Sequence, residues 1–171
     1  MDLVSFRETA DKYSVIFLDA YGVLKSASGL IEGALDVTRS LIDAGKEVFV
    51  VTNDSSRSPE SMATRYNAQA GCELLPPERY ISSGLLASEY IEHQIPYGKV
   101  AYLGKPESAH YIEIAGKIPV SISETSPKDN IVAIVLLDDE GFDWFSEINA
   151  ALTLIRRTNV PVIVANADST Y

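Results

Sequence analysis

The sequence predicts an α/β fold built on parallel strands, and three observations predict it. Short, unbroken apolar runs recur along the 171-residue chain, and polar or glycine-containing turns separate them. Segments with apolar residues at helical spacing lie between these runs. Several runs are apolar at every position, which is typical of strands buried on both faces of a parallel sheet. Alternation of such strands and helices favours β-α-β units.

The first strand is predicted at residues 15–18 and ends in Asp19, with Gly22 three residues later. A carboxylate at the carboxyl end of such a strand occupies the position where open α/β sheets bind ligands. Gly22 allows a sharp turn and lets the backbone approach a ligand closely. An aspartate that merely caps a turn is the alternative, and on this stretch alone both interpretations stay open.

A second strand is predicted at residues 48–51 and ends in Thr52. The intervening residues 31–42 have the spacing of an amphipathic helix, and Gly45 follows at the position of a helix C-cap. Together they form a right-handed β-α-β unit, whose two strand ends lie side by side. The Thr52 hydroxyl and the free loop amides suit a phosphate. Asp19 would repel that phosphate unless it attacks the phosphorus or a cation lies between them.

The segments FLDAYGVL (residues 17–24) and FVVTNDSS (residues 49–56) resemble the first two motifs of the haloacid dehalogenase superfamily of phosphatases. The second half of the chain resembles the class II cap of the branch that contains p-nitrophenyl phosphatases and N-acetylglucosamine-phosphate phosphatases. The resemblance spans nearly the whole chain. It implies part of a Rossmann-like core over residues 1–83 and an α/β cap over residues 84–171.

This resemblance implies a Mg²⁺-dependent phosphatase that acts on a small phosphorylated metabolite such as a sugar phosphate. Asp19 would attack the phosphorus, form an aspartyl-phosphate and also bind the metal. Tyr21 would supply a second metal ligand through its backbone carbonyl. Thr52 would bind the phosphoryl group through its hydroxyl, and Ala20 and Asn53 through their backbone N–H groups. A strand-end threonine that bonds its own turn is the alternative for Thr52.

Tyr21 departs from the family pattern, which is Asp-x-Asp. There, the second aspartate protonates the leaving oxygen and later helps to activate water. A phenol, with a pKa of about 10, is a weaker proton donor at neutral pH than a tuned carboxyl group. General acid–base catalysis is typically worth about 10²–10⁴-fold. We therefore expect weak turnover of alkyl phosphates, and a smaller loss for substrates with acidic leaving groups. A protein that only binds a phosphorylated ligand is the alternative.

Two further family motifs, a lysine and an acidic pair, follow the cap in class II enzymes. No lysine occurs after Lys128, so we expect this chain to be an N-terminal fragment of a longer protein. Alternatively, the chain is a compact phosphatase without a cap, in which these roles fall to Lys105 and to the acidic residues Asp138, Asp139, Glu140 and Asp143. A phospho-acceptor receiver domain is a third interpretation, although the acidic residues before the acceptor strand and the late lysine typical of receivers are missing.

The remaining elements continue the alternation. A helix is predicted from Ser58–Pro59 to Ala70, because a serine followed by proline is a helix-start pattern. Arg57, just before it, is a candidate anchor for an anionic substrate. The apolar spacing of the last helix predicts that Trp144 lies in the core. Further helices are predicted at 85–93, 108–115 and 142–157, strands at 100–103, 119–123, 131–137 and 160–164, and a polar turn at 25–29.

Composition excludes several classes of function. The chain is 46% hydrophobic, enough for a core, and its net charge of −10 argues against nucleic acid and anionic membrane surfaces as partners. The single cysteine, Cys72, excludes an internal disulfide and fits a reducing compartment. The longest apolar run, residues 131–137, is too short to span a bilayer, and residues 1–12 lack a signal-peptide pattern. We therefore expect a cytoplasmic enzyme, and the family resemblance implies a homodimer formed through the cap.

Overall fold

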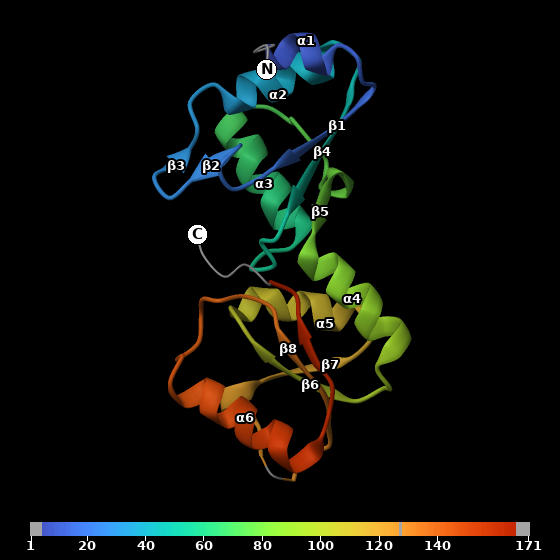
Figure 1. Ribbon diagram of the computed structural model, residues 1–171, viewed down its shortest axis with the longest axis vertical. Helices are drawn as coiled ribbons and strands as arrows, with labels where there is room; N and C mark the ends of the chain where they lie inside the picture. The colour runs from blue at the N-terminus through green and yellow to red at the C-terminus, as the bar shows by residue number, and fades with distance from the viewer. Residues whose placement is uncertain (1–4, 127, 167–171) are drawn as a thin grey trace, which may run out of the picture. The chain divides into compact units, whose positions relative to one another are not determined.

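The computed structural model describes residues 5–126 and 128–166, and contacts within it divide the chain into two compact units (Figure 1). The first unit comprises Met1–Thr52 and Pro59–Ile81, and the second comprises Asn53–Ser58 and Ser82–Tyr171. The short segment 53–58 therefore groups with the later part of the chain. Within the described ranges, no helix combines the length and apolar character that a membrane crossing requires.

The first unit is built around a three-stranded sheet of order β1-β4-β5. Strands β1 and β4 are parallel, with Val15 opposite Glu47 and Asp19 opposite Val51. The elements of this unit are α1 (Phe6–Ala10), β1 (Val15–Asp19), β2 (Lys25–Ser26), β3 (Gly29–Leu30), α2 (Ala34–Asp43), β4 (Glu47–Thr52), α3 (Pro59–Ala70), the 3₁₀ helix η1 (Pro77–Arg79) and β5 (Tyr80–Ser82), whose last residue is counted with the second unit.

The predicted β-α-β unit is confirmed by these elements. Helix α2 ends at Asp43, and Gly45 follows in the left-handed region with φ of 75°, as a C-cap glycine requires. Helix α3 begins at Pro59 and ends at Ala70, as predicted. The predicted polar turn at 25–29 instead contains the antiparallel pair β2–β3, whose two-residue strands are too short to produce a sequence period.

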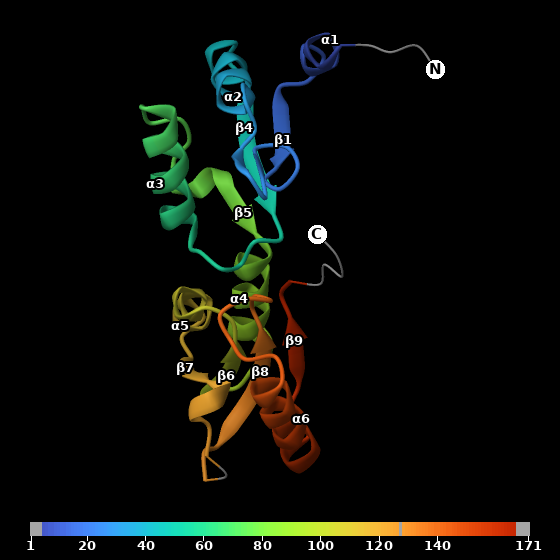
Figure 2. The same cartoon turned by 90° about the vertical axis from the view of Figure 1, so that its left-hand side faces the viewer.

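Only one face of the first sheet is covered among the described residues, which corrects the prediction that the first strand is buried on both faces. Alternate residues of β1 and β4 pack against α2 and α3, whose crossovers lie on the same side of the sheet (Figure 2). The intervening residues Val15, Phe17 and Val51 are 37%, 62% and 40% exposed. The apolar runs at residues 15–18 and 48–51 are thus real strands with an open apolar face.

The second unit contains a four-stranded sheet of order β7-β6-β8-β9, in which every neighbouring pair is parallel. The helices and strands predicted for this half are present, with ends shifted by a few residues. Its elements are α4 (Ser83–Gln94), β6 (Lys99–Leu103), the 3₁₀ helix η2 (Pro106–Ala109), α5 (His110–Ile114), β7 (Ile118–Ser121), the 3₁₀ helix η3 (Ile122–Glu124), β8 (Ile131–Leu136), α6 (Ser146–Thr158) and β9 (Val162–Val164).

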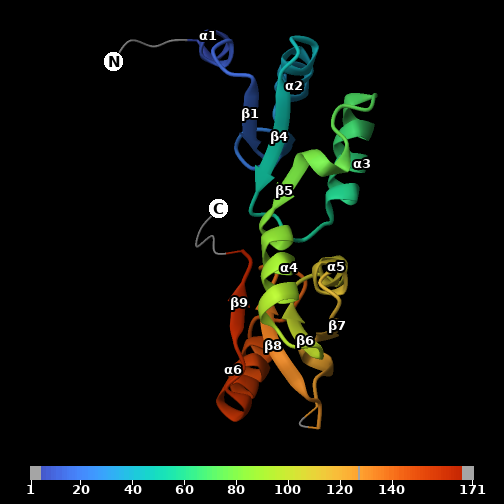
Figure 3. The ribbon, with the colours of Figure 1, turned by 90° about the vertical axis from the view of Figure 1, so that its right-hand side faces the viewer.

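Both faces of this second sheet are covered. Helices α4 and α5 pack on one face with Ala133 and Val135 of β8, and α6 packs on the other with Ile134 (Figure 3). All three strand residues are at most 1% exposed. The second unit is therefore a three-layer α/β/α structure with a core on each side of its sheet.

The prediction that Trp144 lies in the core is wrong, because its side chain is 58% exposed. Helix α6 begins at Ser146, later than the apolar spacing suggested. The Asp143 carboxylate accepts hydrogen bonds from the backbone N–H of Ser146, at 2.6 Å, and from its hydroxyl, at 2.5 Å. Trp144 therefore lies in the loop before the helix, where its indole N–H donates to the Asp139 carbonyl.

Candidate active site

The first candidate residue, Asp19, is the last residue of β1. Ile16 and Leu18 bury their side chains, whereas Asp19 lies in the alternate, exposed set. Its Oδ1 accepts a hydrogen bond from the backbone N–H of Ala20, at 2.7 Å, and Ala20 itself is only 3% exposed. The carboxylate is therefore accessible at the carboxyl end of the strand, and the Ala20 N–H points to it.

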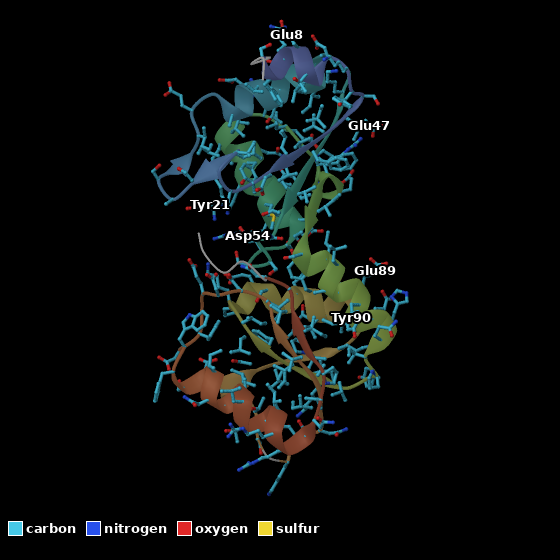
Figure 4. All side chains as sticks on the ribbon, viewed as in Figure 1. Glu8, Tyr21, Glu47, Asp54, Glu89 and Tyr90 are labelled. Atoms are coloured by element: carbon cyan, nitrogen blue, oxygen red, sulfur yellow. The ribbon has the colours of Figure 1, made fainter. Side chains whose placement is uncertain are left out.

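The loop after β1 is a closed turn that carries Tyr21. Gly22 adopts a φ of 84°, which favours glycine, and its N–H donates to the Lys25 carbonyl at 2.7 Å. The Lys25 N–H in turn donates to the Ala20 carbonyl at 2.9 Å. The Tyr21 side chain is 41% exposed and is labelled in Figure 4 on this loop. Two cross-turn hydrogen bonds thus fix the backbone that follows Asp19.

Thr52 ends β4, next to β1. Because Asp19 is opposite Val51 in the parallel register, Thr52 lies one residue beyond Asp19 at the same edge. Thr52 is 6% exposed and lies on the same face of the sheet as the buried residues of β4. Asp19 lies on the opposite face, with the exposed residues of β1. A ligand that contacts both side chains must therefore lie beyond the strand tips rather than on either face of the sheet.

Asn53 follows Thr52 directly, but its contacts group it with the second unit. Its carbonyl accepts a hydrogen bond from the Ser83 hydroxyl at 2.9 Å. Arg57, the candidate anion anchor, directs its guanidinium to its own segment. Its Nη1 is 3.8 Å from the Asp54 carboxylate and donates to the Ser56 hydroxyl at 3.1 Å. The positive charge of Arg57 is thus partly neutralised by Asp54.

The oxygen donors at the end of β1 fit Mg²⁺ in chemical type. A carboxylate, from Asp19, and a backbone carbonyl, from Tyr21, are the hard oxygen ligands that this ion prefers. Among residues 5–126 and 128–166, however, no group of three or more acidic, histidine or cysteine side chains is arranged to hold a metal. The described residues therefore offer two candidate oxygen ligands for a divalent cation, Asp19 and the Tyr21 carbonyl.

A second polar cluster lies within the second unit, around Lys105. Its ammonium group is paired with Glu140 and lies 3.8 Å from Oδ2 of Asp138. Asp138 is 6% exposed, and its Oδ2 has no hydrogen-bond partner among the residues that the structure describes. Burial raises the pKa of the Asp138 carboxyl to about 6, although the Lys105 ammonium opposes the rise. The hydrogen bond to Glu140 raises the pKa of Lys105.

This cluster bears on the alternative of a compact phosphatase without a cap. That alternative needs the strands before Lys105 and Asp138 to extend the sheet that carries Asp19. They are β6 and β8, which form a separate sheet in the second unit. The compact interpretation is therefore wrong.

Sequence reasoning missed two buried hydroxyl groups that hold the chain after Thr52. Ser55 is fully buried and donates to the carbonyl of Leu137, and Tyr111 is fully buried and donates to the carbonyl of Arg57. These partners are 82 and 54 residues apart in sequence, so no local pattern could reveal them.

Asp19 and Thr52 thus lie at the carboxyl ends of adjacent parallel strands, the edge where open α/β sheets bind their ligands. The family comparison is more specific, since the model of the haloacid dehalogenase-like hydrolases matches residues 16–117. The chain belongs to this family of haloacid dehalogenase-like hydrolases.

Individual relatives agree with this assignment. The chain is 24% identical to a 4-nitrophenylphosphatase of Schizosaccharomyces pombe, over 97% of this chain and 60% of the relative. It is 26% identical to a glycerol-3-phosphate phosphatase of Gallus gallus, over 90% of this chain and 54% of the relative. A crystal structure described as a possible sugar phosphatase of the HAD superfamily, from Cytophaga hutchinsonii, superposes with a TM-score of 0.91. It is 40% identical and covers all of this chain and 61% of that one. The chain thus spans 54–61% of the length of these three proteins.

Proposed function

We propose that the protein is a phosphomonoester hydrolase in which Asp19 is the nucleophile and Thr52 binds the phosphoryl group. The observation that carries this proposal is the register of β1 and β4, which brings an exposed carboxylate and a hydroxyl to the same sheet edge. Membership of a hydrolase family supports it, and so do relatives named as phosphatases of small phosphate esters.

In the proposed reaction, Asp19 attacks the phosphorus of the substrate. The bond between phosphorus and the leaving oxygen breaks, and an aspartyl-phosphate forms that water then hydrolyses. The Thr52 hydroxyl and the Asn53 N–H would donate hydrogen bonds to the phosphoryl oxygens. The Ala20 N–H would do the same after exchanging its present partner, the Asp19 carboxylate. Mg²⁺, held by Asp19 and the Tyr21 carbonyl, would supply positive charge against the phosphate.

The most direct test is a screen of phosphate esters with Mg²⁺ on the full-length gene product and its Asp19→Asn variant. The variant keeps the shape of the side chain but cannot form the aspartyl-phosphate, so we expect activity to fall by at least about 10³-fold. Asp43→Asn is the matched control, because Asp43 is an exposed aspartate at the end of α2 in the same unit. Equal activity in Asp19→Asn and wild type would refute the proposal.

Tyr21 sharpens the proposal by predicting a preference for acidic leaving groups. With a tyrosine where the family has its general acid, the leaving oxygen of an alkyl phosphate departs with little proton donation. We expect p-nitrophenyl phosphate to be hydrolysed at least about 100-fold faster than a sugar phosphate, and Tyr21→Asp to narrow this ratio. Equal rates for the two substrates in the wild-type protein would contradict this role of Tyr21.

Residues 84–171, which make up most of the second unit, are proposed to be the cap, and residues 1–83 are proposed to belong to the core. The closed three-layer structure of the second unit supports a separate folding unit, and selection of a small phosphorylated metabolite would fall to the cap. Two copies would associate through this cap, where Trp144 and Phe145 expose 58% and 82% of their surface. Analytical ultracentrifugation of the wild type and of Phe145→Ser measures this association.

A second candidate function is binding of a phosphorylated ligand without turnover. The observation that favours it is Tyr21 at the general-acid position. It predicts measurable phosphate affinity that depends on Thr52, together with no hydrolysis that depends on Asp19. Calorimetric titration of the full-length product with inorganic phosphate, together with the hydrolysis assay above, distinguishes the two: phosphate binding without Asp19-dependent hydrolysis favours this second candidate.

A further inference from the structure

The segment 53–58 continues directly from the phosphate-binding strand end, yet it is bound by the second unit. Ser55 and Ser56 are 0% and 3% exposed, which is unusual for serines in a short loop. The Ser55 hydroxyl donates to the carbonyl of Leu137, the residue just after β8. The segment is therefore anchored to the carboxyl end of the central strand pair of the second sheet.

A second anchor is a chain of hydrogen bonds that ends at Arg57. The backbone N–H of Leu85 donates to the Ser82 hydroxyl, at 3.3 Å, and this hydroxyl lies 2.7 Å from that of Tyr111. Tyr111 has one hydroxyl proton and donates it to the Arg57 carbonyl, at 2.6 Å, so Ser82 donates to Tyr111. Tyr111 is 0% exposed, and its ring packs so closely on Gly84 that a Cβ there would lie 2.3 Å from Cε2.

The topology of the second sheet explains why the segment lies at this edge. From β6 the chain passes through α5 to β7, which lies beside β6 at one edge of the sheet. From β8 it passes through α6 to β9, which lies beside β8 at the opposite edge. The adjacent carboxyl ends of β6 and β8 are thus a topological switch point, where open α/β sheets bind their ligands. Here the Ser55 hydroxyl donates to the Leu137 carbonyl at this edge, so residues of the chain itself contact the strand ends.

We propose that Tyr111 and Ser55 are positioning residues for phosphate binding. By holding the segment 53–58 within the second unit, they restrict the backbone conformations of Asn53, whose N–H is proposed to contact the phosphoryl group. A backbone that is ordered in advance loses less conformational entropy when the ligand binds. This inference rests on the proposed phosphate-binding role of the Asn53 N–H.

Calorimetric titration of the full-length gene product with inorganic phosphate, in the presence of Mg²⁺, tests the inference. The variants are Tyr111→Phe, Ser55→Ala and their combination. Each removes one buried hydrogen bond to the segment, and we expect the Kd for phosphate to rise about 5- to 10-fold per variant. The stoichiometry should stay that of the wild type, because a merely structural loss lowers the active fraction and leaves Kd unchanged.

Two matched controls remove the same groups elsewhere in the second unit. Ser88→Ala deletes a buried hydroxyl that donates to the Leu85 carbonyl within α4, at 2.8 Å. Tyr102→Phe deletes a half-buried phenol on β6. Both should bind phosphate with the Kd of the wild type. Amide hydrogen exchange of residues 55–58 should be faster in Tyr111→Phe and Ser55→Ala than in either control.

Each outcome decides between the proposals. A raised Kd at unchanged stoichiometry, with faster exchange in the segment, supports the inference. An unchanged Kd overturns it while leaving the proposed function intact, and so does a rise that the two controls share. Wild-type protein that binds phosphate but shows no Asp19-dependent hydrolysis contradicts the proposed hydrolysis alone. Wild-type protein without phosphate affinity overturns both.

Discussion

The two sheets of this protein bury their strands differently. Strand β1 of the first unit alternates between buried and exposed residues, whereas β8 of the second unit has no exposed residue. Residues 15–18 of β1 and residues 131–136 of β8 are apolar at every position. The difference lies in the helices, which cover one face of the first sheet and both faces of the second. An apolar run thus predicts a strand in a parallel sheet, but not how many of its faces the described chain covers.

The strongest test of this difference places a charge on each sheet. Val135→Asp introduces a carboxylate at a position with 0% exposure, and we expect the second unit to lose more than about 4 kcal/mol of unfolding free energy. Val51→Asp, at 40% exposure on the open face of the first sheet, should cost about 1 kcal/mol. Urea unfolding of the 171-residue chain measures both values. Similar losses of unfolding free energy in the two variants would mean that the exposed face of the first sheet is covered in solution.

A smaller effect is expected from the buried carboxyl group of the second unit. Because burial raises the pKa of Asp138 from 3.8 to about 6, the folded state binds more protons than the unfolded state between about pH 4 and pH 6. The unfolding free energy should therefore fall as pH rises through this range, by on the order of 3 kcal/mol. Asp138→Asn should remove this dependence and stabilise the protein at pH 7.

The control for this prediction is Asp143, a carboxyl group whose pKa is shifted in the opposite direction. Hydrogen bonds from Ser146 lower the pKa of Asp143, so its stabilising contribution is lost as pH falls below about 4. Asp143→Asn should leave the slope between pH 4 and pH 6 as in the wild type. Thermal unfolding at a series of pH values provides the measurement. A slope that persists in Asp138→Asn would show that another group causes it.

The smallest predicted effect is the difference in unfolding free energy between alanine substitutions at one glycine of each unit. Gly84→Ala puts a methyl group 2.3 Å from the buried Tyr111 ring, and we expect it to cost about 1–3 kcal/mol through overpacking. Gly45→Ala meets no atom within 4 Å, and its cost of about 1 kcal/mol would come from the φ of 75° alone. Chemical denaturation ranks the two variants. A larger loss for Gly45→Ala would contradict the tight packing under Tyr111.

Most of the fold could be predicted from the sequence because strand runs, helix periods and capping glycines are local signals. The neighbouring positions of Asp19 and Thr52 followed from one β-α-β unit, whose crossover is also local. The position of Trp144 was predicted wrongly because helix α6 begins only at Ser146, so Trp144 lies in the loop before it. Ser55 and Tyr111 could not be found, because their burial depends on partners more than 50 residues away. The contacts that hold the segment 53–58 are therefore defined only by the folded chain.

The assignment of residues 53–58 to the second unit has a consequence for how this protein can be divided. The backbone passes between the units three times, after Thr52, after Ser58 and after Ile81. No single proteolytic cleavage can release one unit intact from the other. Genetic exchange of the second unit between homologous proteins would likewise have to transfer two stretches of DNA rather than one contiguous cassette.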